Sequence, residues 1–240
     1  MKVEVAFTAV EQGGPTASGR TAVVIDVLRA TSSMVEALVN GARRIIPVAT
    51  VEEAVAKKNE LGRDAALLCG ERGGRMIPGF DLGNSPLEFT PAAFAGRTLV
   101  MSTTNGTPTL LATAGSRVCL IAALLNIEAT AQRIVAEGND VLIVCAGREG
   151  RFSIDDAVTA GVLTQRIRAA GKIPLRLDDG ARAAVALAFR SRRDLAATLH
   201  RSAAGRSLRR IGHGDDVDYC AQVDRHNVVP VFEQHRIELS

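Results

Sequence analysis

Short runs of Val, Ile, Leu and Ala alternate along this chain with longer stretches that read as helices, and this alternation constrains the fold most. The apolar runs cover residues 3–7, 22–25, 45–48, 65–69, 98–101, 118–123 and 141–145. Strands buried on both faces of a parallel sheet read as such continuous runs. Strands that alternate with helices form parallel sheets covered on both faces. The sequence therefore predicts an α/β fold of three layers, α/β/α, with a mostly parallel sheet.

Two segments of the chain repeat the same order of elements. Residues 19–62 and 96–138 each read as strand, loop, helix, strand and helix. In this register Asp26 falls opposite Thr103. The repeat indicates either two similar halves that arose by duplication or the pattern that any two βα units share. No linker separates the segments, so we treat residues 1–240 as one unit.

The composition agrees with a large aliphatic core. Of the 240 residues, 47% are hydrophobic, but Trp is absent and Tyr occurs once. The cysteines, which are Cys69, Cys119, Cys145 and Cys220, lie far apart and lack the C-x-x-C spacing of zinc or redox sites, so we expect buried, reduced thiols. We see no charged-then-apolar leader and no apolar run of about 18 residues. These features predict a soluble, cytoplasmic protein without a membrane partner.

The charge pattern does not indicate a nucleic-acid partner. The net charge of +3 is too small to imply a polyanionic ligand. Arginines gather near the C-terminus, at Arg190, Arg192, Arg193, Arg201, Arg206, Arg209 and Arg210. They form either a nucleic-acid face or a solvated helical face, and the lack of aromatic residues among them favours the second. The oligomeric state stays open, a homo-oligomer included.

The apolar run at residues 65–69 leads into a segment that a protein core has no use for. It contains Gly-Glu-Arg at residues 70–72 and Gly-Phe-Asp-Leu-Gly-Asn-Ser-Pro at residues 79–86. Loops on a rigid scaffold are where binding groups concentrate. Carboxylates suit a hard cation, and an Arg with backbone N–H groups suits an anion. We therefore expect a site for a small phosphorylated or carboxylated molecule.

Several polar positions follow predicted strands directly, namely Asp26, Glu71, Thr103 and Gly147. In open parallel sheets, ligands bind beyond the carboxyl ends of the strands. We therefore expect these positions to converge on the mouth of one site.

The stretch from Asp26 to Ser32 places a carboxylate, a guanidinium and hydroxyls at one strand end. Asp26 can ligate Mg²⁺, while Arg29 and the N–H groups of the following helix can hold a phosphate. The alternative is a structural Asp26–Arg29 pair, with Thr31 or Ser32 as an ordinary helix cap.

The later loops give weaker signals. Residues 103–107, Thr-Thr-Asn-Gly-Thr, offer hydroxyls and a turn with exposed N–H groups, although Asn-Gly is first a turn signal. Cys145 and Arg151 fit the count of a C-x₅-R phosphatase loop, but Phe152 stands where such loops carry Ser or Thr, which argues against a Cys145 nucleophile. Asp155 and Asp156 read equally as metal ligands or as acids in the first turn of a helix.

Together these segments resemble the 2-phosphosulfolactate phosphatase family, the ComB-like proteins of coenzyme M biosynthesis. The resemblance is carried by the sequences at residues 24–32, 70–72, 79–86, 103–107, 145–147, 152–156 and 160–161, with Asn126. It continues near the C-terminus with Ser202, Gly205, Leu208, Gly212, Asp216, Cys220 and Asp224, and with Val229-Pro230. The family often has Glu where Asp155 stands, a change that keeps the charge.

The resemblance implies an α/β fold and Mg²⁺-dependent hydrolysis of (R)-2-phospho-3-sulfolactate to 3-sulfolactate and phosphate. Two alternatives stay open. One is a Mg²⁺-dependent phosphatase of another small 2-phospho-carboxylic acid, and the other is a non-catalytic binder of such acids.

On this reading, the residues after the predicted strands fall into three sets. The predicted catalytic residues are Asp26, Arg29 and Asp81. The predicted Mg²⁺ ligands come from Asp26, Glu71, Asp81, Asp155 and Asp156. The predicted substrate-binding residues are Thr31, Ser32, Arg72, Asn84, Ser85, Thr103, Thr104, Asn105, Gly106, Thr107 and Arg148. The nucleophile is either an Asp carboxylate, of which Asp26 is the best placed, or a metal-activated water.

Overall fold

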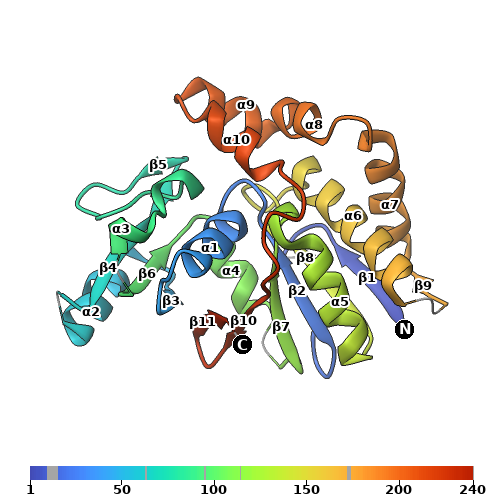
Figure 1. Cartoon of the computed structure of the whole chain (residues 1–240), viewed down its shortest axis with the longest axis horizontal. Coiled ribbons are helices and arrows are strands. Elements are labelled where there is room, and N and C mark those ends of the chain that lie inside the picture. The colour runs from blue at the N-terminus through green and yellow to red at the C-terminus, as the bar shows by residue number, and fades with distance from the viewer. Residues whose placement is uncertain (10–15, 63, 95, 114, 172–173, 240) are drawn as a thin grey trace.

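The computed structural model confirms the predicted alternation of strands and helices (Figure 1). It describes residues 1–9, 16–62, 64–94, 96–113, 115–171 and 174–239. The strands are β1 (Lys2–Ala6), β2 (Thr21–Ile25), β3 (Arg44–Pro47), β4 (Ala66–Arg72), β5 (Arg75–Met76), β6 (Thr98–Ser102), β7 (Val118–Ala122), β8 (Val141–Cys145), β9 (Arg176–Leu177), β10 (Pro230–Glu233) and β11 (Arg236–Leu239). The helices are α1 (Ala30–Val39), α2 (Val51–Leu61), α3 (Pro91–Phe94), α4 (Gly106–Leu111), α5 (Ile127–Glu137), α6 (Ile154–Gly171), α7 (Asp179–Ser191), α8 (Leu195–Arg201), α9 (Ala203–Arg210) and α10 (Gly214–Cys220), with 3₁₀ turns η1 (Pro86–Glu88) and η2 (Leu124–Asn126).

The strands form one sheet in the order β5-β4-β6-β3-β11-β10-β7-β2-β8-β1-β9. One parallel block contains β4, β6 and β3, and another contains β7, β2, β8, β1 and β9. The hairpin β10–β11 lies between the blocks and is antiparallel to both β7 and β3. The prediction of a mostly parallel sheet is therefore confirmed, and the antiparallel hairpin is an addition that the sequence did not predict.

The two repeated segments are interlocked. The order β2, α1, β3, α2 recurs as β6, α4, β7, α5 (residue 114, within the second segment, lies outside the described residues). β2 and β6 each have 5 residues, and α2 and α5 each have 11. β2 pairs with β7, and β6 pairs with β3. Each segment thus supplies one strand to each parallel block, so neither segment could be a separate domain.

The sheet curls so that the ends of β2 and β6 meet. Five strand spacings separate these strands, which is about 24 Å in a flat sheet. Yet Asp26, after β2, and Thr103, after β6, both lie within 3.3 Å of the point where a Cβ on Gly106 would stand. Curvature of the sheet around α1 and α4 therefore brings the two loops together, and Figure 1 shows these helices between the two blocks.

Helices cover both faces of the sheet. Along β2, Val23 belongs to a core cluster with Ile134 of α5 on one face. On the other face, Val24 clusters with Met34 of α1 and Leu110 of α4. The helix α2 packs on the outer face of β4 and β6. This arrangement confirms the three-layer fold and explains why the strands are apolar along their whole length.

The C-terminal helices α8, α9 and α10 lie together at the top of Figure 1, before the chain returns to form β10–β11. Among the described residues, none of the helices combines the length and the apolar character that crossing a membrane requires.

Candidate active site

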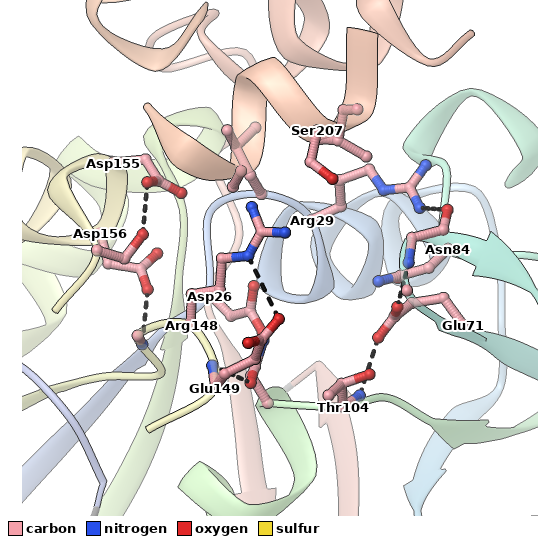
Figure 2. Close-up of a pocket in the computed structure, with 18 residues that line it drawn as sticks. Asp26, Arg29, Glu71, Asn84, Thr104, Arg148, Glu149, Asp155, Asp156 and Ser207 are labelled. Atoms are coloured by element: carbon pink, nitrogen blue, oxygen red, sulfur yellow. Dashed lines mark hydrogen bonds and ion pairs between the residues drawn. The ribbon is translucent and has the colours of Figure 1, made fainter. Parts of the chain in front are cut away.

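A cavity of about 140 Å³ lies where the loops after β2, β6 and β8 and the end of β4 meet beside α9 (Figure 2). Its lining consists of Asp26, Leu28, Arg29, Glu71, Gly73, Gly74, Asn84, Thr104, Asn105, Gly147, Arg148, Glu149, Ser153, Asp155, Asp156, Ala204, Ser207 and Leu208. The expected convergence is confirmed for Asp26, Glu71 and Gly147, and for the loop that follows β6.

Buried carboxyl groups dominate the lining, namely those of Asp26, Glu71, Asp155 and Asp156. Asp156 accepts hydrogen bonds from the backbone N–H groups of Val27, at 2.9 Å, and Gly147, at 3.0 Å. These bonds use both oxygens and tie the loop after β2 to the loop after β8. Asp156 therefore has a structural role, because it holds the backbones of these two loops together.

Glu71, on the opposite side of the cavity from Asp156 in Figure 2, also holds two backbone segments together. Its carboxylate accepts the backbone N–H groups of Gly74, at 2.7 Å, and Thr104, at 2.9 Å. The Thr104 N–H group, which was predicted to bind an oxyanion of the ligand, thus already donates its hydrogen bond to a carboxylate. Glu71 joins the β4–β5 turn to the loop after β6.

Burial and mutual repulsion make the carboxyl groups resist ionisation. Burial, with the nearby charge of Glu71, raises the pKa of Asp26 to about 7. Burial, and then the charges of Asp155 and Asp26, raise the pKa of Asp156 well above its ordinary value. Burial also raises the pKa of Asp155, although hydrogen bonds from Ser153 and Ser202 oppose the rise. A bound cation would relieve this repulsion.

Arg29 enters the cavity from a buried position. Its Nη1 donates to Asp216 Oδ2 and its Nη2 to the Gly74 carbonyl oxygen, each at 2.5 Å. Both members of the Arg29–Asp216 ion pair are almost fully buried. The guanidinium orientation is therefore fixed before any ligand binds.

Arg148 projects into the cavity from a tight loop, as Figure 2 shows. Its backbone N–H and C=O groups pair with those of Arg151, at 2.8 and 2.9 Å. A Cβ on Gly147 would stand 2.4 Å from the Arg151 carbonyl oxygen, so only glycine fits there. Among the described residues, the Arg148 guanidinium has one ion pair, to Glu149 at 3.8 Å. Arg148 thus keeps hydrogen-bond donors available for an anionic ligand.

Some buried polar atoms at or beside the cavity lack protein partners. They are Asn84 Oδ1, Thr103 Oγ1 and Thr107 Oγ1, all in nearly fully buried residues. Buried polar groups are almost always hydrogen-bonded in folded proteins. The Asn84 side chain lines the cavity, so its free oxygen marks a place where a ligand or an ordered water completes the structure.

A scan with the 2-phosphosulpholactate phosphatase family model matches residues 8–235. The chain belongs to the 2-phosphosulpholactate phosphatase family. A relative from Caldanaerobacter subterraneus, named a probable 2-phosphosulfolactate phosphatase, is 39% identical over 92% of this chain and 91% of its own. Two further relatives carry the same name. The one from Clostridium acetobutylicum is 39% identical over 99% of this chain and 100% of its own. The one from Deinococcus radiodurans is 43% identical over 88% of this chain and 87% of its own.

Asp81, which was predicted to be a catalytic residue and a Mg²⁺ ligand, lies apart from the cavity. Its carboxylate accepts the backbone N–H of Leu68 and pairs with Lys58 of α2, both at 2.7 Å, and it does not line the cavity. The loop returns beside β4, where the N–H groups of Asp81 and Leu82 bond to the Leu68 carbonyl oxygen. This pairing turns the Asp81 side chain toward α2, on the outer face.

Other predicted binding residues support the site without lining it. Thr31 Oγ1 accepts the Asp26 N–H at 3.1 Å, and Ser32 Oγ donates to the Val27 carbonyl oxygen at 2.8 Å, so both stabilise the loop after β2. Ser85 Oγ donates to Asp216 at 2.6 Å. Direct contact with substrate, predicted for these hydroxyls, is therefore not what the structure provides.

Arg72 also lies outside the cavity, contrary to prediction. Its guanidinium donates to Ser102 Oγ at 2.9 Å and to the backbone oxygens of Glu71, Ser102 and Ala49. These bonds hold β4 against the end of β6. Of the predicted binding residues, those that line the cavity are Asn84, Thr104, Asn105 and Arg148. Gly106, Thr103 and Thr107 are not part of the lining, although Gly106 lies close to Asp26 and Thr103.

Several site residues were missed by the sequence analysis. Ala204, Ser207 and Leu208 come from α9 and complete one wall, while Asp216 of α10 holds Arg29. The family resemblance contained the signal, because Ser202, Gly205, Leu208 and Asp216 were among its motif residues, but their spacing alone assigns no role.

The alternative of a Cys145 nucleophile receives no support. Cys145 is the last residue of β8, is fully buried and does not line the cavity. The Arg148–Arg151 pairing closes a turn in place of a phosphate-binding loop around the thiol.

Proposed function

We propose that this protein is a Mg²⁺-dependent phosphatase that hydrolyses (R)-2-phospho-3-sulfolactate to 3-sulfolactate and phosphate, as the names of its relatives indicate. The observation that carries the proposal is one cavity that combines the buried Asp26 carboxyl with two guanidinium groups, Arg29 and Arg148. As the resemblance implies, this reaction would place the protein in coenzyme M biosynthesis.

The donor set fits Mg²⁺ in a particular way. In the described part of the chain, no group of three or more His, Cys, Asp or Glu side chains is placed so that it could hold a metal ion by itself. Both oxygens of Glu71 and of Asp156 already tie two loops together through backbone N–H groups. Asp155 is held instead by the Ser153 hydroxyl, and Asp26 by the backbone N–H of Ala30, so these two carboxylates are the better donors. Mg²⁺ commonly binds through one or two carboxylates, with substrate phosphate and waters as the other ligands. Asp26 and Asp155 would therefore hold the ion.

Charge gives a second reason for a cation. The cavity is lined by five acidic side chains, Asp26, Glu71, Glu149, Asp155 and Asp156, but by only two arginines. A substrate that carries phosphate, carboxylate and sulfonate would be repelled by this lining. Bound Mg²⁺ supplies the missing positive charge and offsets charge on the phosphoryl oxygens.

The protein's own groups would then orient the ester. Arg29 is fixed by two hydrogen bonds and can stabilise charge that develops on the phosphoryl group. Asn84, which lies beside Arg29 in Figure 2, and Asn105 also line the cavity. The acidic groups exclude other anions until the cation is present.

Asp26 takes the central role in bond cleavage. Its carboxylate can attack phosphorus directly or accept the proton of an attacking water. A phosphoaspartate trapped by rapid acid quench would select direct attack, and its absence during turnover would select the water.

The test is phosphate release from phosphosulfolactate, phospholactate and phosphoglycolate, with Mg²⁺ or with EDTA. Wild type, Asp26→Asn and the exposed control Asp64→Asn are compared. We expect Mg²⁺-dependent release from phosphosulfolactate that Asp26→Asn abolishes and Asp64→Asn leaves intact.

Other outcomes would replace the proposal. Faster release from phospholactate or phosphoglycolate would indicate a phosphatase of another 2-phospho acid. Binding of all three without release in Mg²⁺ would indicate a non-catalytic binder.

A further inference from the structure

The segment from Ser202 to Asp216, which we call the clamp segment, touches both sides of the cavity. It contains α9, which supplies Ala204, Ser207 and Leu208 to the wall. We propose that the clamp segment positions the reacting groups, with Asp216 holding Arg29 and Ser202 holding Asp155. This inference rests on the proposed function, because it assigns roles to residues that act on the same site.

Asp216 is built to hold a guanidinium. Its Oδ2 accepts from Arg29 Nη1 at 2.5 Å, and its Oδ1 accepts from Ser85 Oγ at 2.6 Å. His213 Nδ1 lies 3.2 Å from the same Oδ2. The Arg29 and Asp216 side chains are only 2% and 3% exposed. A buried charge without its partner is strongly unfavourable, so the buried position of Arg29 depends on Asp216.

Asp216 acts through Arg29 and not on the substrate. It does not line the cavity, whereas Arg29 does. The second Arg29 bond, to the Gly74 carbonyl oxygen at 2.5 Å, leaves the orientation of the guanidinium defined by both contacts. Asp216 is therefore a positioning residue that links α10 to the loop after β2.

The hydroxyl of Ser202 lies on the side of the cavity that carries Asp155. Its Oγ accepts the Gly205 N–H at 2.9 Å and so caps α9. The same side chain lies close enough to Asp155 to help lower the pKa of that carboxyl, which also receives the Ser153 hydroxyl at 2.5 Å. Because Oγ accepts from Gly205, its proton is free to point at the Asp155 carboxylate. The start of α9 and the orientation of Asp155 are thus set together.

Two glycines of the clamp segment, Gly205 and Gly212, determine the path of the backbone between Ser202 and Asp216. A Cβ on Gly205 would stand 2.1 Å from the Leu199 carbonyl oxygen, so only glycine lets α9 start this close to α8. Gly212 has a φ of 90°, which favours glycine. The Leu208 carbonyl oxygen accepts the N–H groups of Ile211 and His213, which closes the turn before α10. The spacing from Ser202 to Asp216 therefore follows from a rigid path between two anchor points.

A double-mutant cycle tests the role of Asp216. Wild type, Arg29→Met, Asp216→Asn and the double variant are compared for kcat and KM with phosphosulfolactate and Mg²⁺. Removing a transition-state donor costs about 100-fold in kcat, and we expect this from each single variant. If Asp216 acts through Arg29, the double variant matches Arg29→Met within about threefold. Multiplied losses in the double variant would overturn the assignment.

Folding and turnover are separated by further variants. The double variant removes both buried charges and so stays foldable even if Asp216→Asn does not. Asp218→Asn, on the same helix and paired with His200 at the surface, is the control that should keep wild-type kcat.

Binding of inorganic phosphate with Mg²⁺, measured by calorimetry, should weaken at least tenfold in Asp216→Asn. If Asp216→Asn binds phosphate as tightly as wild type does, the role of the clamp segment is refuted, whether or not any substrate is turned over. If wild type turns over no substrate but Asp216→Asn still binds phosphate more weakly than wild type, only the proposed function is refuted.

For Ser202, the matched control is Thr50→Ala, because Thr50 caps α2 and does not line the cavity. We expect Ser202→Ala and Thr50→Ala to lower the melting temperature by similar amounts. Only Ser202→Ala should lower kcat, by about tenfold, and Ser202→Thr should restore most of it. Equal kcat in the two alanine variants would show that Ser202 is a helix cap and nothing more.

Discussion

Asp26 and Thr103 hold corresponding places in the two interlocked segments, and their side chains meet beside Gly106. Asp26 Oδ2 lies 3.3 Å, and Thr103 Oγ1 3.0 Å, from the position that a Cβ on Gly106 would take. Each residue directly follows the first strand of its segment. The site therefore lies where the two segments face each other, with Asp26 of one segment and Thr104 and Asn105 of the other in its lining.

Gly106→Ala should lower activity more than stability. The added methyl would stand 3.0 Å from Ala30 Cβ as well as against Asp26 and Thr103, so the carboxylate must shift. We expect kcat to fall about tenfold or more, because small displacements of reacting groups are costly, and stability to fall by about 1–3 kcal/mol. Steady-state kinetics and urea unfolding measure the two effects.

The control for this variant is Ile134→Val in α5, a fully buried site in the core. It should cost about 0.5–1.5 kcal/mol of stability and leave kcat near that of wild type. If Gly106→Ala also kept wild-type kcat, the close approach of the two segments would be irrelevant to catalysis.

Asp26→Asn should stabilise the metal-free protein at pH 8 while it abolishes activity. Burial and the charge of Glu71 raise the pKa of Asp26 to about 7, so the ionised form is unfavourable in the folded state. Asparagine removes that charge, and each kcal/mol gained raises the melting temperature by about 2–4 °C in a chain of this size. Thermal melts in EDTA and in Mg²⁺ give the measurement. Mg²⁺ should raise the melting temperature of wild type much more than that of the variant, and equal shifts would remove Asp26 from the metal site.

Asp81→Asn should affect stability and spare activity. Burial opposes ionisation of Asp81, but hydrogen bonds from Lys58 and the Leu68 N–H outweigh it and lower the pKa below the ordinary value of 3.8. A lowered pKa contributes stability above pH 3.8, and this contribution is lost as the pH falls through the folded-state pKa. Because the side chain is 35% exposed, we expect a loss of at most about 1 kcal/mol at pH 7.

Urea unfolding at pH 7 and at a series of lower pH values tests this prediction, since the difference between Asp81→Asn and wild type should shrink as the pH falls through the folded-state pKa of Asp81. Lys58→Met should reproduce part of the loss at pH 7. A strong decrease in kcat for Asp81→Asn would restore the catalytic role that the sequence suggested.

The fold and the acidic set were predictable because they follow from local patterns. Apolar runs gave the strands, and Asp26 and Glu71 stood at strand ends, where an α/β fold gathers its ligands. Asp81 looked equivalent to them in the sequence. Its loop, however, pairs with the backbone of β4, a tertiary contact that turns the side chain toward Lys58.

The C-terminal elements were hidden for a different reason. The turn between β10 and β11 has positive φ at Gln234 and His235, where hairpins usually carry Asn-Gly. Without that signal the hairpin is not recognisable in the sequence. Likewise, Asp216 reaches Arg29 across a sequence separation of 187 residues, and no local pattern predicts that contact.

Arg148→Met should change substrate preference more than catalysis. Arg29 is committed to Asp216 and to the Gly74 carbonyl oxygen. The Arg148 side chain, 36% exposed, has within the described part of the chain one ion pair, to Glu149 at 3.8 Å. A guanidinium with available donors can bind a sulfonate or carboxylate through two parallel hydrogen bonds. We expect kcat/KM for phosphosulfolactate to fall at least about tenfold, which corresponds to about 1.4 kcal/mol, and to change little for phospholactate, which lacks the sulfonate. Glu149→Gln, which removes the competing carboxylate, should leave this preference in place or increase it. Equal losses of kcat/KM on both substrates in Arg148→Met would mean that Arg148 binds a group common to them, the phosphate or the carboxylate.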